Sequence, residues 1–106
     1  MPGFTLARYQ DTEQFQPLTL VNQTVGVAAA ALAAVPDEAR GAIISGDGSA
    51  NAVRYSLAAA TAATATLGIR LDGTDTVIIW SRAALLAMTL IREDAGDVVV
   101  SVQFFK

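Results

Sequence analysis

Two glycine-containing stretches have the spacing of phosphate-binding loops. Gly41 and Gly46 are spaced as in the nucleotide-binding loop, in which a lysine after the second glycine contacts the phosphates. Here Asp47 occupies that position, and its negative charge would repel a phosphate. Gly46 and Gly48 lack the third glycine of a dinucleotide-binding turn, where this chain has Asn51. We therefore interpret these glycines as turn residues and expect no bound cofactor.

One polar segment partly matches a calcium-binding loop. Asp47, Ser49 and Asn51 stand where such a loop has its first three oxygen ligands. The loop also needs a glycine at its sixth position and a bidentate glutamate at its twelfth, but this chain has Ala52 and Ala58 there. The sequence contains no histidine and no cysteine, which are the usual ligands of zinc sites. We expect no metal site and interpret the segment as a polar turn.

Residues for acid–base or nucleophilic catalysis are scarce. Asp72 with Asp75, and Asp94 with Asp97, are pairs of carboxylates beside glycines, where turn formation explains them. No serine has a histidine to activate it, and a serine–lysine pair would need the chain's single lysine, Lys106. We expect no catalytic residue and no enzymatic activity.

The composition predicts a single soluble domain that associates with other proteins. The chain has 106 residues, of which 53% are hydrophobic and 16% are charged, with a net charge of −3. This balance gives no basic surface for nucleic acid. The longest apolar run, residues 25–35, is far shorter than the roughly 20 residues that cross a bilayer, and residues 1–15 lack the pattern of a secretion signal. So few charges on so small a domain leave apolar surface exposed, which predicts a homo-oligomer or docking on a larger assembly.

Alternation of apolar and polar residues predicts several strands. The clearest case is residues 98–105, in which every even position is apolar and β-branched or aromatic residues dominate. Val53, Tyr55 and Leu57 alternate with polar or small residues and predict a strand with one solvated face. Residues 76–80 are apolar on both faces, which is typical of a central strand covered on both sides. Shorter candidates are residues 19–27 and 41–45.

Glycine and aspartate mark the connections between these strands. They cluster at residues 46–48, 72–75 and 93–97, and we expect the last of these to be a five-residue hairpin loop. Regular turns between short strands predict an all-β fold, a single small antiparallel β-sandwich or barrel-like domain. We place the β domain at residues 18–106 and an N-terminal arm or edge segment at residues 1–17.

Three segments are ambiguous between helix and strand. Residues 28–34 and 58–65 are rich in alanine, the strongest helix former, so short helical turns are compatible with both. The second has threonines and no bulky apolar stripe, and we interpret it as extended or loop. In residues 81–92, Ser81 could cap a helix that presents Leu85, Met88 and Ile91, whereas a strand would bury Leu86, Met88 and Leu90. We favour a strand after a short turn.

The aromatic residues suggest where partners bind. Trp80 follows three β-branched or apolar residues, which predicts a place in the core. The N-terminal segment carries Phe4, Tyr9 and Phe15 without regular pattern, which suggests an arm that docks on a neighbour or on its own sheet. The candidate interface residues are Phe4, Tyr9, Phe15, Leu18, Phe104 and Phe105.

Parts of the sequence resemble a group of small structural proteins of tailed bacteriophages. The resemblance rests on residues 52–55, Ala-Val-Arg-Tyr, followed by residues 63–71 with their Thr-Ala-Thr-Leu-Gly stretch. Residues 85–91 and 98–105 resemble that group's final hairpin, which ends in an aromatic pair. The likeness covers roughly residues 42–105. It departs at residues 57–62, which replace the turn common in that group, so this loop is expected to face a different neighbour.

The resemblance implies a β-rich virion component without enzymatic activity. The leading expectation is a head-decoration or cement protein that stabilises the head by binding between capsomers. Its partners would be the major capsid protein or other virion proteins, and its location the virion, assembled in the host cytoplasm. A tail or baseplate accessory protein is the first alternative. A small carbohydrate-binding or adhesin module is the second, since exposed aromatic rings stack on sugars.

Overall fold

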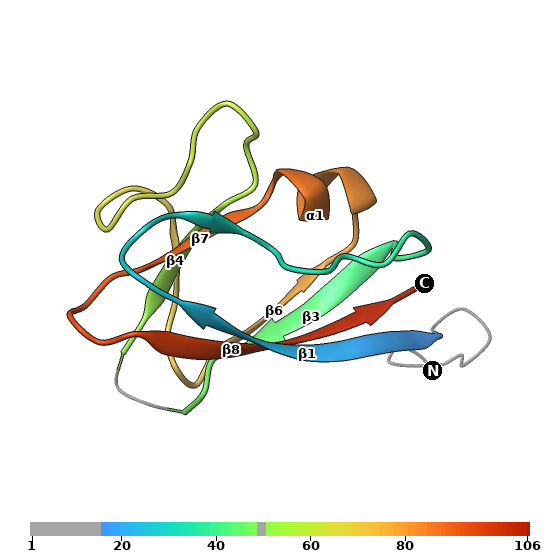
Figure 1. Cartoon of the computed structure of the whole chain (residues 1–106), viewed down its shortest axis with the longest axis horizontal. Helices are drawn as coiled ribbons and strands as arrows, with labels where there is room; N and C mark the ends of the chain where they lie inside the picture. The colour runs from blue at the N-terminus through green and yellow to red at the C-terminus, as the bar shows by residue number, and fades with distance from the viewer. Residues whose placement is uncertain (1–15, 49–50) are drawn as a thin grey trace, which may run out of the picture.

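The computed structural model describes residues 16–48 and 51–106, which form eight strands and one short helix (Figure 1). The elements follow in the order β1 (Pro17–Val25), β2 (Ala30–Ala31), β3 (Gly41–Ser45), β4 (Val53–Ser56), β5 (Ile69–Leu71), β6 (Thr76–Ile79), α1 (Arg82–Ala87), β7 (Thr89–Arg92) and β8 (Val98–Phe105). Within these ranges no helix is long and apolar enough to span a membrane.

The strands pair as one long hairpin that is folded over on itself. β1 pairs with β8, β2 with β7, β3 with β6 and β4 with β5, and every pair is antiparallel. Further pairing of β3 with β8 and of β4 with β7 divides the hairpin into two sheets. Sheet A has the order β1-β8-β3-β6 and sheet B the order β2-β7-β4-β5. Nested pairs distributed over two four-stranded sheets are the topology of a jelly roll. The expected all-β sandwich is confirmed.

The core lies between the two sheets and is entirely apolar. The strands contribute alternate residues to it, as strand geometry requires. In β8 the even positions Val98, Val100, Val102 and Phe104 are at most 1% exposed, which confirms the predicted alternation. Burial also raises the pKa of the Tyr55 phenol. The other large buried residues are Val25, Leu32, Ile44, Val53, Leu71, Ile79, Leu85, Met88 and Leu90.

Four of the predicted strands correspond to strands of the structure. They are residues 19–27, 41–45, 53–57 and 98–105. β1 begins at Pro17, so the expected boundary between arm and domain falls inside this strand. The backbone of Gln16 already exchanges two hydrogen bonds of 2.9 Å with Lys106. In Figure 1 the chain accordingly ends beside the start of β1. The rest of the predicted arm, residues 1–15, lies outside the described residues.

The prediction of a hairpin at residues 93–97 is wrong. This segment joins β7 of sheet B to β8 of sheet A, and the two strands do not pair with each other. The turn at residues 72–75 likewise passes from sheet B to sheet A. Turn residues of the same type serve hairpins and corners between sheets alike, so their composition does not tell the two apart. Gly46 is required at its corner, since a Cβ there would lie 2.6 Å from the backbone of Gly73.

The ambiguous segments follow tertiary packing rather than propensity. Neither alanine-rich segment is helical, because residues 30–31 form β2 and residues 58–65 form a loop. The favoured strand after a short turn begins only at Thr89, because residues 82–87 form the helix α1. The expected burial of Leu86 is wrong, since this residue is 59% exposed. Ser81 caps α1 by accepting a hydrogen bond of 3.1 Å from the backbone of Ala84, and the six-residue helix buries Leu85. β7 follows and buries Leu90.

The prediction that residues 76–80 form a central, doubly covered strand is also wrong. β6 is an edge strand of sheet A, paired only with β3. Its Val77 and Ile79 point toward sheet B, whereas Ile78 is 51% exposed. Trp80, expected in the core, is 68% exposed. Apolar residues on both faces are therefore explained here by an uncovered apolar surface and not by a second layer.

We expect Leu90→Ala to destabilise the fold by about 2–5 kcal/mol, because it removes a fully buried side chain from the centre of the sandwich. Leu86→Ala is the matched control, since Leu86 on α1 is 59% exposed, and its effect should stay within about 0.5 kcal/mol. Urea unfolding followed by tryptophan fluorescence measures both changes. Equal effects of the two substitutions would contradict the assignment of the core.

Candidate functional site

The side chains of sheet A that point away from the core form a surface without a single charged residue. We call this surface the outer face of sheet A. Its extent follows from the strand registers and from the alternation of buried and exposed positions. Its residues are Leu20, Asn22, Thr24, Gly41, Ile43, Ser45, Thr76, Ile78, Trp80, Val99, Ser101, Gln103 and Phe105.

Apolar and polar residues alternate in rows across this face. In the first row, the registers align Leu20, Gln103, Ile43 and Ile78, which are apolar except for Gln103. The two end residues, Leu20 and Ile78, are 63% and 51% exposed. The next row consists of Asn22, Ser101, Ser45 and Thr76. Its members bond to one another within the face: the Ser101 hydroxyl donates to Asn22 over 2.9 Å, and the Ser45 and Thr76 hydroxyls lie 3.0 Å apart. The hydrogen-bonding groups of this row are therefore largely paired with one another within the sheet surface.

A cluster of rings ends the face at the C-terminal end of β6. Trp80 packs edge-on against Phe105, with ring centroids 4.7 Å apart and an interplanar angle of 64°. The Phe105 ring lies over Gly41, where a Cβ would come within 2.4 Å of it. Glycine at position 41 therefore allows Phe105 to lie flat on the sheet, and Phe105 supports Trp80. Phe105 is only 1% exposed, whereas Trp80 stays accessible.

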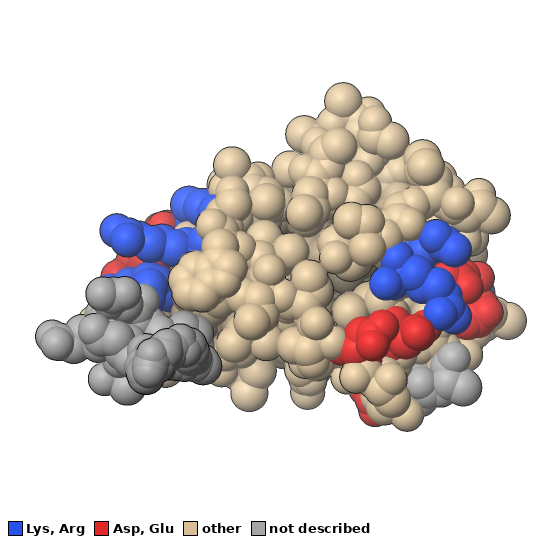
Figure 2. All heavy atoms as spheres, turned by 180° about the vertical axis from the view of Figure 1, so that it is seen from behind, with Lys and Arg blue, Asp and Glu red and all other residues tan. Residues whose placement is uncertain are grey.

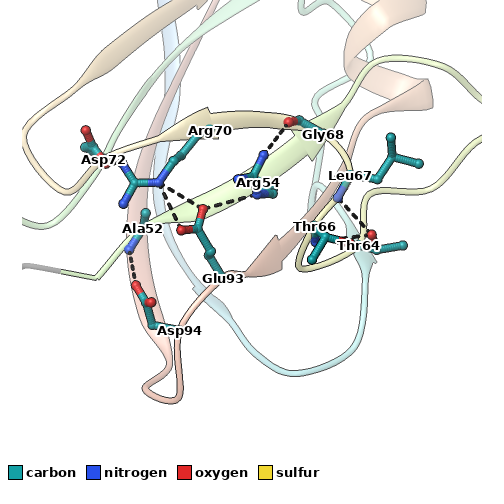
Figure 3. Close-up of polar contacts among 10 residues, drawn as sticks. All are labelled: Ala52, Arg54, Thr64, Thr66, Leu67, Gly68, Arg70, Asp72, Glu93 and Asp94. Atoms are coloured by element: carbon teal, nitrogen blue, oxygen red, sulfur yellow. Dashed lines mark hydrogen bonds and ion pairs between the residues drawn. The ribbon is translucent and has the colours of Figure 1, made fainter.

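Sheet B carries charged residues on its corresponding surface (Figure 3). Arg54 on β4 and Arg70 on β5 are directly paired, and Glu93 lies between their guanidinium groups. Arg70 Nε donates to both carboxylate oxygens of Glu93, over 2.9 and 3.0 Å. Arg54 Nε lies 3.1 Å from Glu93 Oε1, and its other end donates to the Gly68 carbonyl over 2.9 Å. Arg70 also pairs with Asp72.

This charged cluster is an internal ion network and not an anion-binding site. Its acidic side chains already bond to the guanidinium groups, and the hydrogen bond to Glu93 is the main cause that raises the pKa of Arg70. Beside it, the loop over residues 57–67 folds back on sheet B, where the Ala63 amide donates to the Thr89 hydroxyl over 3.0 Å. Among the described residues no three carboxylate side chains gather in a way that could hold a metal ion.

Charged residues gather at two ends of one face of the molecule. Figure 2, a view from behind, shows Lys, Arg, Asp and Glu gathered at two opposite ends with uncharged surface between them. One charged group is the network around Arg54. Another is the pair of Lys106 and Glu38, in which the hydrogen bond from Lys106 holds the pKa of Glu38 below its usual value.

The candidate interface residues are distributed over different environments. Phe104 is fully buried in the core, so it packs the sandwich and does not reach a partner. Phe105 lies on the outer face of sheet A beneath Trp80. Leu18 is half-buried and packs against the core. The remaining candidates, Phe4, Tyr9 and Phe15, lie outside the described residues.

Sequence reasoning missed the most exposed apolar residues of the face, which are Leu20, Ile78 and Trp80. Strand alternation does place Leu20 on the opposite side from Val21, which packs against the core. No local signal places Ile78 and Trp80 on an open surface, because their exposure follows from the position of β6 at the end of sheet A.

We expect Glu93→Gln to lower the melting temperature at low ionic strength. The substitution keeps the size of the side chain but leaves Arg54 and Arg70 as directly paired like charges, which repel. Most of the loss should disappear near 1 M salt, where the Debye length is about 3 Å. Asp37→Asn is the control, since Asp37 is exposed and should show little effect. A loss that does not depend on salt would contradict the role of Glu93 in charge neutralisation.

A scan against protein-family models finds no match for this chain, and neither do searches of the curated proteins and of the solved structures. Its function must therefore be inferred from the surfaces of the fold.

Proposed function

We propose that this protein is a structural component of a tailed-bacteriophage virion that binds the head as a decoration or cement protein. The observation that carries this proposal is the outer face of sheet A, which has no charged residue and exposes Leu20, Ile78 and Trp80. A surface of this kind gains free energy when water leaves it, by about 25 cal/mol for each Å² of apolar area buried. The surface of a capsomer would be the partner surface against which this face is buried.

The chemistry of the face also favours a binding role. Contiguous exposed apolar patches on small proteins are typical of interaction sites. Tryptophan is enriched among the residues that dominate binding free energies, and Trp80 is held in place by Phe105. The asparagine, serine and threonine row supplies hydrogen-bonding groups without the desolvation cost of a charge. These features suit a partner recognised by shape and apolar contact.

Two further considerations are consistent with a virion protein. The resemblance at residues 52–55 and 63–71 points to tailed-phage structural proteins. In the fold these residues lie in β4, β5 and the loop before β5, on sheet B, so this motif and the uncharged face are on opposite sides of the sandwich. Jelly rolls also occur in viral capsid domains, although a shared topology by itself does not give a function.

A carbohydrate-binding module is the second candidate, and the exposure of Trp80 favours it. An accessible indole beside hydroxyl and amide side chains is a surface on which a sugar ring can stack. Jelly rolls include lectin domains as well as capsid domains. The tail or baseplate alternative uses the same face as the head proposal and differs only in the partner.

We expect the full chain to cosediment with DNA-free heads of its phage, and heads assembled without it to be less stable to heat. Leu20→Lys and Val99→Lys should each weaken binding at least tenfold, by about 1.4 kcal/mol or more, because they place a charge in the apolar contact. Val27→Lys is the matched control, since Val27 is 73% exposed but follows β1 outside this face.

The other candidates have distinct outcomes in the same series. Binding to purified tails but not to heads would favour the tail component. Binding on a glycan array that is lost in Trp80→Ala would favour the sugar module. Heads that are equally stable without the protein, or that bind Leu20→Lys as well as the unmodified chain, would contradict the cement proposal.

A further inference from the structure

We propose that two copies of this chain pair through the free edges of β6, so that sheet A continues from one copy into the other. This inference concerns self-association and does not rest on the proposed function. The occupant of the free edge is a second copy of the same strand.

Three of the four sheet edges carry features that oppose pairing with another chain. Edge strands in natural proteins are protected by proline, bulges, charged residues or shortness. β1 begins with Pro17, which has no N–H donor, and its register shifts between Pro17 and Leu20. β2 has two residues, and β5 has three with Arg70 at their centre. β6 has four residues, its pairing with β3 has no register shift, and residues 76–80 contain no proline and no charge.

The free backbone groups of β6 belong to Thr76, Ile78 and Trp80. Gly46 donates its N–H to the Asp75 carbonyl over 3.1 Å, which identifies Asp75 and Gly46 as a hydrogen-bonded pair between β6 and β3. Hydrogen-bonded and non-hydrogen-bonded residues alternate along an antiparallel pair. The backbone N–H and C=O groups of Val77 and Ile79 therefore point toward β3. Those of Thr76, Ile78 and Trp80 point away from it. In the described part of the chain no strand pairs with this side.

The strand is complementary to a second copy of itself. A two-fold axis at Ile78 places the two Ile78 residues opposite each other as a hydrogen-bonded pair and sets Thr76 opposite Trp80 of the second copy. The charges at the two ends also match. Asp75 precedes the uncharged segment and Arg82 follows it, and antiparallel pairing brings the acidic end of one copy beside the basic end of the other.

Neither end charge is already used in an ion pair within the described ranges. The salt bridges there involve other residues. Arg82 donates to the backbone carbonyls of Pro36 and Ala39, over 2.7 and 3.0 Å, and these neutral acceptors leave its positive charge in place. The Asp75 side chain accepts a hydrogen bond of 3.1 Å from the backbone of Asp72, which is a neutral donor.

Pairing would join two uncharged faces into one sheet of eight strands, with Ile78 and Trp80 of both copies at its centre and Leu20 at its two outer edges. Five paired residues bury less than the roughly 800 Å² per partner of a standard interface, so we expect a weak, concentration-dependent dimer.

Sedimentation velocity of the full chain from about 5 to about 500 μM should show a shift from monomer to dimer, corresponding to a Kd in the micromolar range. Hydrogen exchange measured at the lowest and the highest of these protein concentrations identifies the residues that pair in the dimer. The amides of Ile78 and Trp80 should become protected as the concentration rises, whereas those of Val77 and Ile79, already bonded to β3, should not change. A chain that stays monomeric throughout would overturn the proposal.

Ile78→Lys should abolish the dimer, because it sets two ammonium groups opposite each other at the two-fold axis. Leu20→Lys is the matched control: Leu20 is similarly exposed on the same face, but on β1, and this variant should dimerise like the unmodified chain. If Ile78→Lys does not fold, Thr76→Lys tests the same edge, and this variant should also weaken the dimer. Equal loss of the dimer in Leu20→Lys would show that the faces stack, which overturns edge pairing. Dimerisation without head binding, or the reverse, separates this proposal from the proposed function.

Discussion

The fold depends on β8, which is hydrogen-bonded along both of its sides. It pairs with β1 over almost its whole length and with β3 from Ser101 to Phe105, so it connects the beginning, the middle and the end of the chain. Its alternate residues Val98, Val100, Val102 and Phe104 fill the core. Side chains of a strand alternate strictly between its two faces. The register of β8 with β1 and β3 therefore decides which residues of these strands point into the core and which point to the surface.

The same alternation produces two outer surfaces of opposite character. On sheet A it exposes leucine, isoleucine and tryptophan together with hydroxyl and amide side chains. On sheet B it exposes Arg54 and Arg70, which Glu93 neutralises between them. This partly exposed ion network keeps the surface of sheet B polar. The outer face of sheet A is therefore uncharged, whereas sheet B carries an ion network on its surface.

The sequence predicted the strands better than their arrangement. The period-two pattern located β1, β3, β4 and β8, because each has one face in the core and one outside. It failed for β6, since an edge strand with an exposed apolar face has the same composition as a central strand covered twice. Ser81 does cap a helix, which was the alternative to the favoured strand, and the length of α1 is set by the burial of Leu85 and by the start of β7. The connection at residues 93–97 joins two sheets, and its residues would serve a hairpin equally well.

The position of Trp80 shows why the outer face of sheet A could not be predicted from local sequence. A tryptophan after a run of β-branched residues is favoured in a core, and the chain places one here outside it at a cost in exposed apolar area. The surrounding residues are adapted to this placement: Gly41 has no side chain to displace Phe105, and Phe105 supports the indole from below. An exposed ring that is held in a fixed orientation loses less conformational entropy on binding than a mobile one. In the proposed binding role, the contact of Trp80 with Phe105 over Gly41 would lower the entropy that this exposed ring loses when a partner covers it.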